Sequence, residues 1–137
     1  MAALTGITAV RPTSNTVLTG PVLYGATIAA GQSVYLDASD SKYKLCDCNL
    51  SASAAAIKGV AVTPGVLDGY GYIATGGNVI LVGTTMAVGE TYYAGGTAGT
   101  IIPDGDLTTG DYVSRIGTAA STTELDLAIK ATGIQHA

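Results

Sequence analysis

The sequence predicts an all-β protein, a small β-barrel or β-sandwich built from two related β-units and preceded by an extended N-terminal arm. Three observations carry this prediction: nineteen glycines spread along the chain, short apolar or alternating runs between turn signals, and a motif that occurs twice. Short strands separated by regular turn signals are typical of small barrels and sandwiches. The chain of 137 residues is long enough for one domain with its own core.

The repeated motif keeps a constant offset along the chain. The first copy occupies residues 27–63 and the second occupies residues 85–121. Each begins with a glycine turn followed by an aromatic strand, and the turn moves from Gly31 to Gly89, a separation of 58 residues. Each copy ends in an apolar strand that contains a glycine. Because the register is kept without a gap, the similarity indicates a duplicated β-unit. The alternative is a chance similarity in a chain rich in glycine, alanine and threonine.

The expected strands lie between these turn signals, and most of them alternate polar with apolar residues. Strands are expected over residues 22–24, 33–36, 42–46, 57–62, 69–74, 78–82, 91–93, 100–102, 111–116 and 123–130. The tripeptide Thr75-Gly76-Gly77 is typical of a hairpin turn between two of them. One helical turn is expected over residues 51–56, where Ser51 is suited to the N-cap and alanine favours helix.

We divide the chain into an N-terminal arm, residues 1–22, and a single β domain, residues 23–137. The arm is apolar but interrupted by polar residues, and Pro12 restricts Arg11 to extended geometry. Two structures fit this pattern: an arm that lies on a partner subunit, or a first strand and loop of the same domain. The residues expected to contact a partner are Leu4, Ile7, Val10, Arg11 and Pro12.

Charge is scarce, because charged residues make up 12% of the chain and the net charge is −4. That share is about half of the usual one, and a weakly charged surface favours association. The six basic residues are scattered, which argues against binding to nucleic acid or to an anionic membrane. No run approaches the roughly 18 apolar residues of a membrane span, and the start lacks a signal-peptide profile. The sequence therefore predicts a soluble protein made in the cytoplasm.

No catalytic, cofactor or metal site is expected. The single histidine, His136, lies next to the C-terminal residue, where a chain tends to fray, so it is a poor catalytic base. Cys46 and Cys48 are too close in sequence for an unstrained disulfide and lack the further ligands of a metal site, so we interpret them as reduced thiols. Asp104 and Asp106 fit a polar turn better than a calcium loop, which needs six or more ligands.

Several short motifs resemble the head decoration, or capsid cement, proteins of tailed bacteriophages. These motifs are GQSVYLD at 31–37, IKGVA at 57–61, VGETYY at 88–93, LTTGDYVSRIGTA at 107–119 and TTELDL at 122–127. Similar glycine–tyrosine strand phrases also occur in phage fibre proteins. The resemblance covers roughly residues 26–130.

The resemblance implies a structural virion protein that binds the outer surface of an icosahedral phage capsid and stabilises it. The implied partners are the major capsid protein and further copies of the chain, in a homotrimer. The protein would be made in the host cytoplasm and located on the capsid exterior. It implies no enzyme activity and no cofactor. Many such proteins contact the shell through an N-terminal arm, which agrees with the interpretation of residues 1–22.

Two other classes remain as alternatives. A phage fibre or receptor-binding module would contact host-surface carbohydrate by stacking tyrosine rings on sugars. The tyrosines that could do so are Tyr70, Tyr72, Tyr92 and Tyr93. A small hydrolase is disfavoured, because no base, nucleophile pair or metal set can be assembled from the sequence.

Overall fold

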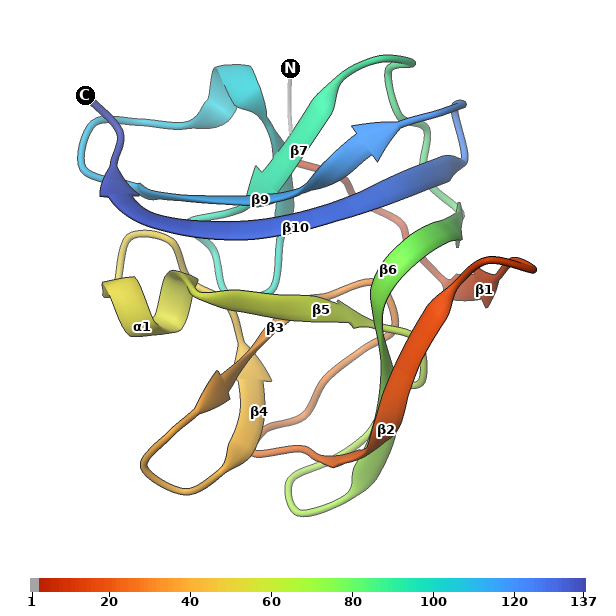
Figure 1. The fold of residues 1–137 in the computed structure, drawn as a ribbon, viewed down its shortest axis with the longest axis vertical. Helices are drawn as coiled ribbons and strands as arrows, with labels where there is room; N and C mark the ends of the chain where they lie inside the picture. Colours follow the sequence, from red (N-terminus) through yellow and green to blue (C-terminus); the bar gives the residue numbers. More distant parts are fainter. Residues whose placement is uncertain (1–2) are drawn as a thin grey trace.

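The computed structural model describes residues 3–137, and within them it contains ten strands, one short helix and one 3-10 turn (Figure 1). The elements are β1 (Ala9–Pro12), β2 (Val17–Leu23), β3 (Ser33–Asp37), β4 (Lys42–Leu45), α1 (Ala52–Ala55), β5 (Ile57–Ala61), β6 (Tyr70–Val82), β7 (Thr91–Ala94), β8 (Ile101–Pro103), η1 (Asp104–Asp106), β9 (Tyr112–Ala119) and β10 (Glu124–Gln135). The named strands pair antiparallel in a strongly curled sheet. The prediction of an all-β fold is therefore confirmed.

Strand β6 connects the two halves of the molecule. Its first half pairs with β2 and β5, and its second half pairs with β1 and β10. Figure 1 shows β6 as a long curved strand that runs from the part formed by β2–β5 to the part formed by β7–β10. Strand β6, which lies between the two copies of the motif, therefore connects the first unit to the second.

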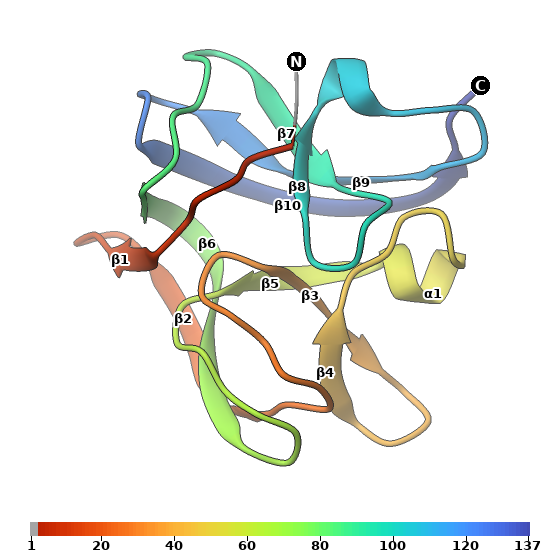
Figure 2. The same ribbon diagram turned by 180° about the vertical axis from the view of Figure 1, so that it is seen from behind.

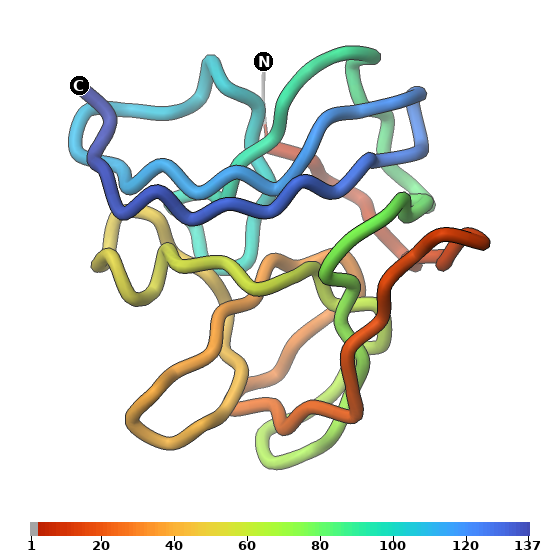
Figure 3. The backbone as a smooth tube through the Cα atoms, viewed as in Figure 1, coloured from red at the N-terminus to blue at the C-terminus, as the bar shows by residue number. Residues whose placement is uncertain are grey.

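The hairpin predicted at Thr75-Gly76-Gly77 is wrong, because the chain continues through these residues as one strand. Gly77 has a φ of +71°, and a side chain there would overlap the backbone of Asn15. The glycine bends β6 instead of reversing it, as the smooth trace in Figure 3 shows. The direction is kept because each side of the bend has its own pairing partners, β2 before it and β10 after it.

The two β-units have the same strand register. Val34 on β3 pairs with Gly59 on β5, and Tyr92 on β7 pairs with Gly117 on β9. Both positions are followed by a register shift, so the irregularity is repeated at the 58-residue offset as well. The hairpins β3–β4 and β7–β8 also correspond residue by residue. Matching registers and matching bulges indicate related units, because a bulge is a specific local feature.

The glycine turns that open the units are also equivalent. Gly31 donates its N–H to the carbonyl of Ala61, and Gly89 donates to the carbonyl of Ala119, both at 2.8 Å. The two glycines have φ values of +88° and +83°, in the left-handed region that favours glycine. The turns therefore join the first and third strands of each unit in the same way.

Two buried clusters form the interior. The smaller lies inside the first unit around Tyr24, whose ring fits between Gly65 and Gly71 and whose hydroxyl donates to the carbonyl of Thr63 at 2.8 Å. The larger cluster fills the second unit and the junction with the first. Tyrosine thus supplies the aromatic bulk of the first unit while its one polar atom keeps a hydrogen-bond partner.

The structure also answers two further predictions, on the helical turn and on the N-terminal segment. The helical turn α1 forms where expected, and the Ser51 hydroxyl accepts a hydrogen bond from the Ala54 N–H at 3.1 Å. The N-terminal segment is extended, as predicted, but it lies on its own chain: β1 and β2 both pair with β6. Of the two structures considered for this segment, strands within the same domain are the ones observed.

The close approach of strands at the unit centres gives the first testable prediction. A Cβ at Gly59 would lie 2.6 Å from the carbonyl oxygen of Ala74, and one at Gly117 would overlap the carbonyl of Asp126. We expect Gly117→Ala to destabilise the fold by about 1–3 kcal/mol or more, since overpacking forces the backbones apart. Urea unfolding measures this change.

The matched control is Gly105→Ala, because no atom lies within 4 Å of a Cβ at that position. Its unfolding midpoint is expected to stay at the wild-type value. Equal stability of the two variants would contradict the close strand approach.

Candidate binding surface

Exposed apolar side chains gather along β2, the loop between β5 and β6, and the first half of β6. Strands β2 and β6 are paired in a two-stranded ribbon, and the β5–β6 loop leads into one end of it (Figures 1 and 2). The exposed apolar side chains come from both strands and from this loop. We call them the ribbon surface; its members are Val17, Leu18, Val66, Leu67, Tyr70 and Tyr72. Exposed apolar residues grouped on two neighbouring strands and the adjoining loop mark a candidate interaction site.

The structure separates the five predicted arm contacts into two groups. Val10 is buried in the larger core cluster, and Leu4 and Ile7 are packed against it. Arg11 and Pro12 are exposed, and Arg11 forms no ion pair with another residue of the described chain. The first three side chains therefore attach the N-terminal segment to its own domain, and the last two face solvent.

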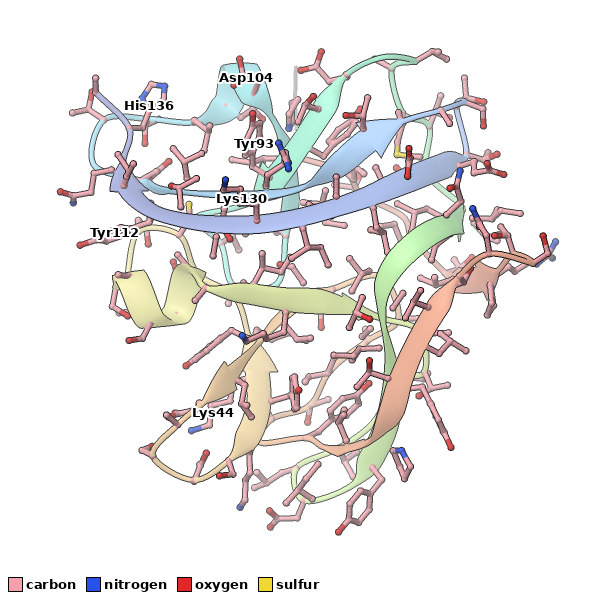
Figure 4. The ribbon with its side chains drawn as sticks, viewed as in Figure 1. Lys44, Tyr93, Asp104, Tyr112, Lys130 and His136 are labelled. Atoms are coloured by element: carbon pink, nitrogen blue, oxygen red, sulfur yellow. The ribbon has the colours of Figure 1, made fainter. Side chains whose placement is uncertain are left out.

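The four tyrosines considered for sugar stacking also fall into separate environments. Tyr70 and Tyr72 are 67% and 43% exposed, and as alternate residues of β6 they point to the same side. Tyr92 is buried, and its hydroxyl accepts a hydrogen bond from the Ala87 N–H at 3.0 Å. Tyr93 is half-buried on β7 (Figure 4). The structure therefore leaves Tyr70 and Tyr72 as the exposed pair.

Two surface hollows occupy equivalent places in the two units. The first, of about 530 Å³, lies between α1 and the β3–β4 turn, and the second, of about 480 Å³, lies beside η1. Lining residues that correspond at the 58-residue offset are Ala38 and Gly96, Ser39 and Thr97, Leu50 and Thr108, and Ser53 and Asp111. The first hollow has exposed leucines, Leu36 and Leu50, whereas the second has Asp106 and Asp111, so hollows at corresponding places differ in chemistry.

The β3–β4 hairpin carries a small charge cluster. The Lys44 ammonium lies 2.7 Å from Asp37 Oδ2 and 2.9 Å from Asp40 Oδ2 (Lys44 is labelled in Figure 4). These hydrogen bonds hold the pKa of both carboxyls below the ordinary value and raise the pKa of Lys44. The cluster is near the surface, so it stabilises the hairpin only modestly.

Both cysteines are buried thiols. They form no disulfide, and burial raises the pKa of Cys46 and of Cys48 to about 12. A thiol with so high a pKa is protonated at neutral pH and is a weak nucleophile. Cys46 packs in the larger core cluster.

The remaining polar candidates lie at the C-terminal end of the chain and on η1. His136 is held by backbone hydrogen bonds to Asp111 at 2.6 Å and Gly110 at 3.0 Å, so the prediction of a frayed end is wrong at this residue. Its Nδ1 is buried without a hydrogen-bond partner, so no carboxylate orients the imidazole as in a catalytic triad. Asp104 and Asp106 lie on η1 (Figure 4), and the described residues contain no group of three metal-ligating side chains.

Comparison of the chain with protein-family models, with curated proteins and with solved structures finds no match. Within the described residues, no helix has the length and apolar character needed to cross a bilayer.

Sequence reasoning missed the ribbon surface for a physical reason. Its members are spread from Val17 to Tyr72, and those on β2 lie beside those on β6 only because these two strands pair. One local signal was present: Val66-Leu67 lies between turn residues, where apolar side chains have no core to enter.

Burial of the cysteines predicts slow reaction with thiol reagents. The native chain at pH 8 is expected to label at neither cysteine, and the urea-unfolded chain at both, because unfolding restores solvent access and an ordinary pKa. Absorbance with a chromogenic disulfide reagent follows the reaction. Rapid labelling of the folded chain would contradict the buried positions of Cys46 and Cys48.

The charge cluster predicts a particular pH dependence. A carboxyl whose pKa is lowered by folding adds stability above its unfolded pKa of 3.8, and this stability is lost as the pH falls below that value. Lys44→Met removes the shared partner, so it should lower stability at pH 7 and reduce the further loss between pH 5 and pH 3. Urea midpoints at these pH values measure both effects.

Lys58→Met is the control, since Lys58 is exposed and forms no ion pair within the described chain. Its acid profile should follow the wild-type curve. A Lys44→Met profile that also follows this curve would show that the cluster contributes nothing.

Proposed function

We propose that this chain is a structural virion protein that binds the outer surface of an icosahedral phage capsid and stabilises it. Its proposed partners are the major capsid protein and further copies of itself, as a homotrimer, on the capsid exterior. The observation that carries the proposal is the ribbon surface, an exposed apolar strip on a weakly charged protein. The motifs that resemble capsid decoration proteins supply the kind of partner.

The strength of such contacts favours binding in many copies. Covering a half-exposed valine or leucine contributes about 1 kcal/mol, and association itself costs several kcal/mol. One ribbon surface therefore binds weakly by itself. Linking copies in an oligomer raises the effective affinity without new contacts. Many bound copies across subunit boundaries would then raise the free energy needed to open the shell.

The structure revises which residues we propose as shell contacts. Arg11 and Pro12 remain candidates because they are exposed, and Arg11 is suited to a forked pair with a capsid carboxylate. Leu4, Ile7 and Val10 are engaged with the chain's own core. The ribbon surface takes their place as the apolar part of the contact.

A second candidate function has one observation in its favour. Tyr70 and Tyr72 present exposed rings on the same side of β6, which suits stacking on a sugar. A receptor-binding module would use this pair on host-surface carbohydrate. The two functions differ in what the protein binds, so one assay separates them.

Co-sedimentation with expanded phage heads tests the proposal. The wild-type chain should bind saturably, and Val66→Asp should bind about tenfold more weakly, since a charge in an apolar contact costs 1.4 kcal/mol or more. The matched control is Val88→Asp, because Val88 is 66% exposed and lies outside the ribbon surface, while Val66 is 64% exposed within it.

Equal binding of the two variants would contradict the ribbon surface as the contact. Binding of the wild-type chain to host cells but not to heads would instead support the carbohydrate function. In that case Tyr70→Ala should abolish cell binding.

A further inference from the structure

The two β-units differ in the backbone hydrogen bonds made by one of their outer strands, β4 in the first unit and β8 in the second. In the first unit Gly25 donates its N–H to the carbonyl of Tyr43 on β4 at 2.7 Å, which joins the end of β2 directly to β4. The equivalent carbonyl of the second unit, 58 residues further on, belongs to Ile101 on β8. It accepts a hydrogen bond from Leu4 at 2.9 Å, not from Gly83, the counterpart of Gly25.

The N-terminal segment is thus inserted into the second unit as an extra strand. Thr8 donates its N–H to the Val82 carbonyl at 2.8 Å, and β1 continues this pairing along the second half of β6. Figure 2 shows the segment running between β8 and the β6 edge. It fills the place where the first unit makes direct contact between its own strands.

The inserted segment fits this place closely. A Cβ at Gly6 would lie 3.0 Å from the Gly83 carbonyl oxygen, so the two backbones meet where neither residue has a side chain. Ile7 covers the Gly31 turn, where a Cβ would lie 2.5 Å from Ile7 Cγ2. The groove between β6 and β8 therefore selects an extended apolar segment with a glycine at this point.

We propose that residues 3–12 are an exchangeable strand, and that the same segment of a second copy occupies the groove between β6 and β8. The occupant's chemistry is observed, because the chain's own segment is seated there. In the first unit, the end of β2 bonds directly to β4 with no inserted segment. The second unit can therefore keep its strand order when its inserted segment is withdrawn. Exchange restores the contacts of residues 3–12 between identical chains and is a low-cost route to association.

The hinge of this exchange lies at residues 13–16. Within it, Thr13 donates its hydroxyl to the Asn78 carbonyl at 3.1 Å and Asn78 donates its backbone N–H to Asn15 Oδ1 at 3.1 Å, and these bonds must open for the segment to exchange. Beyond it, the chain is fixed by the pairing of Val17–Leu23 with β6. Strand β2 then stays on its own β6. The inference concerns association in solution and does not depend on capsid binding.

Cross-linking between mixed single-cysteine chains tests the exchange. Ala9 and Val82 are register partners, so a disulfide between an Ala9→Cys chain and a Val82→Cys chain forms only if one copy's segment lies on the other copy. After a warm incubation and mild oxidation, we expect this heterodimer on a non-reducing gel, in a yield that rises with protein concentration. The native cysteines are buried and stay unreactive.

The control mixture is Val17→Cys with Gly76→Cys, register partners beyond the hinge, and it should give several-fold less heterodimer. The double variant Ala9→Cys/Val82→Cys should close internally at high dilution, which establishes that the pair can be oxidised. Heterodimer no greater than the control would overturn the exchange. Equal cross-linking of both mixtures would overturn the hinge at residues 13–16, and failure of internal closure would contradict the β1–β6 pairing itself.

Discussion

The structure depends on β6, a single strand that two β-units share. It hydrogen-bonds with four others, β2 and β5 before its glycine bend and β1 and β10 after it. Because both units are completed by the same strand, neither can shift its register without disturbing the other. Gly77 makes this sharing possible, since only a residue without a side chain fits against Asn15 at the bend.

This arrangement also determines where the surface is hollow and where apolar side chains are exposed. The two units have hollows at corresponding places, whereas the ribbon surface lies on β2, the β5–β6 loop and the first half of β6. In the second unit the corresponding edge is covered by the N-terminal segment. One edge of the sheet is thus covered by β1, while the ribbon surface stays exposed, which suits a protein that acts through contact area. The low charge of the chain keeps the free-energy cost of removing that area from water small.

The sequence predicted features that depend on local pattern. The all-β fold, the 58-residue offset and the Ser51 cap follow from turn residues, alternation and capping preferences, which neighbouring residues determine. Features set by distant pairing were beyond it. Gly76-Gly77 reads as a turn in isolation, and only the separate partners of each half make it a bend. Likewise, the burial of Val10 depends on its position opposite Leu81 of β6.

The most direct test of the central claim is hydrogen–deuterium exchange of the chain, free and bound to expanded phage heads. The proposal predicts new protection in β2 and over residues 66–72, with the loop around Val88 unchanged. Protection confined to other parts of the chain, or no difference between the free and head-exposed protein, would contradict capsid binding through the ribbon surface.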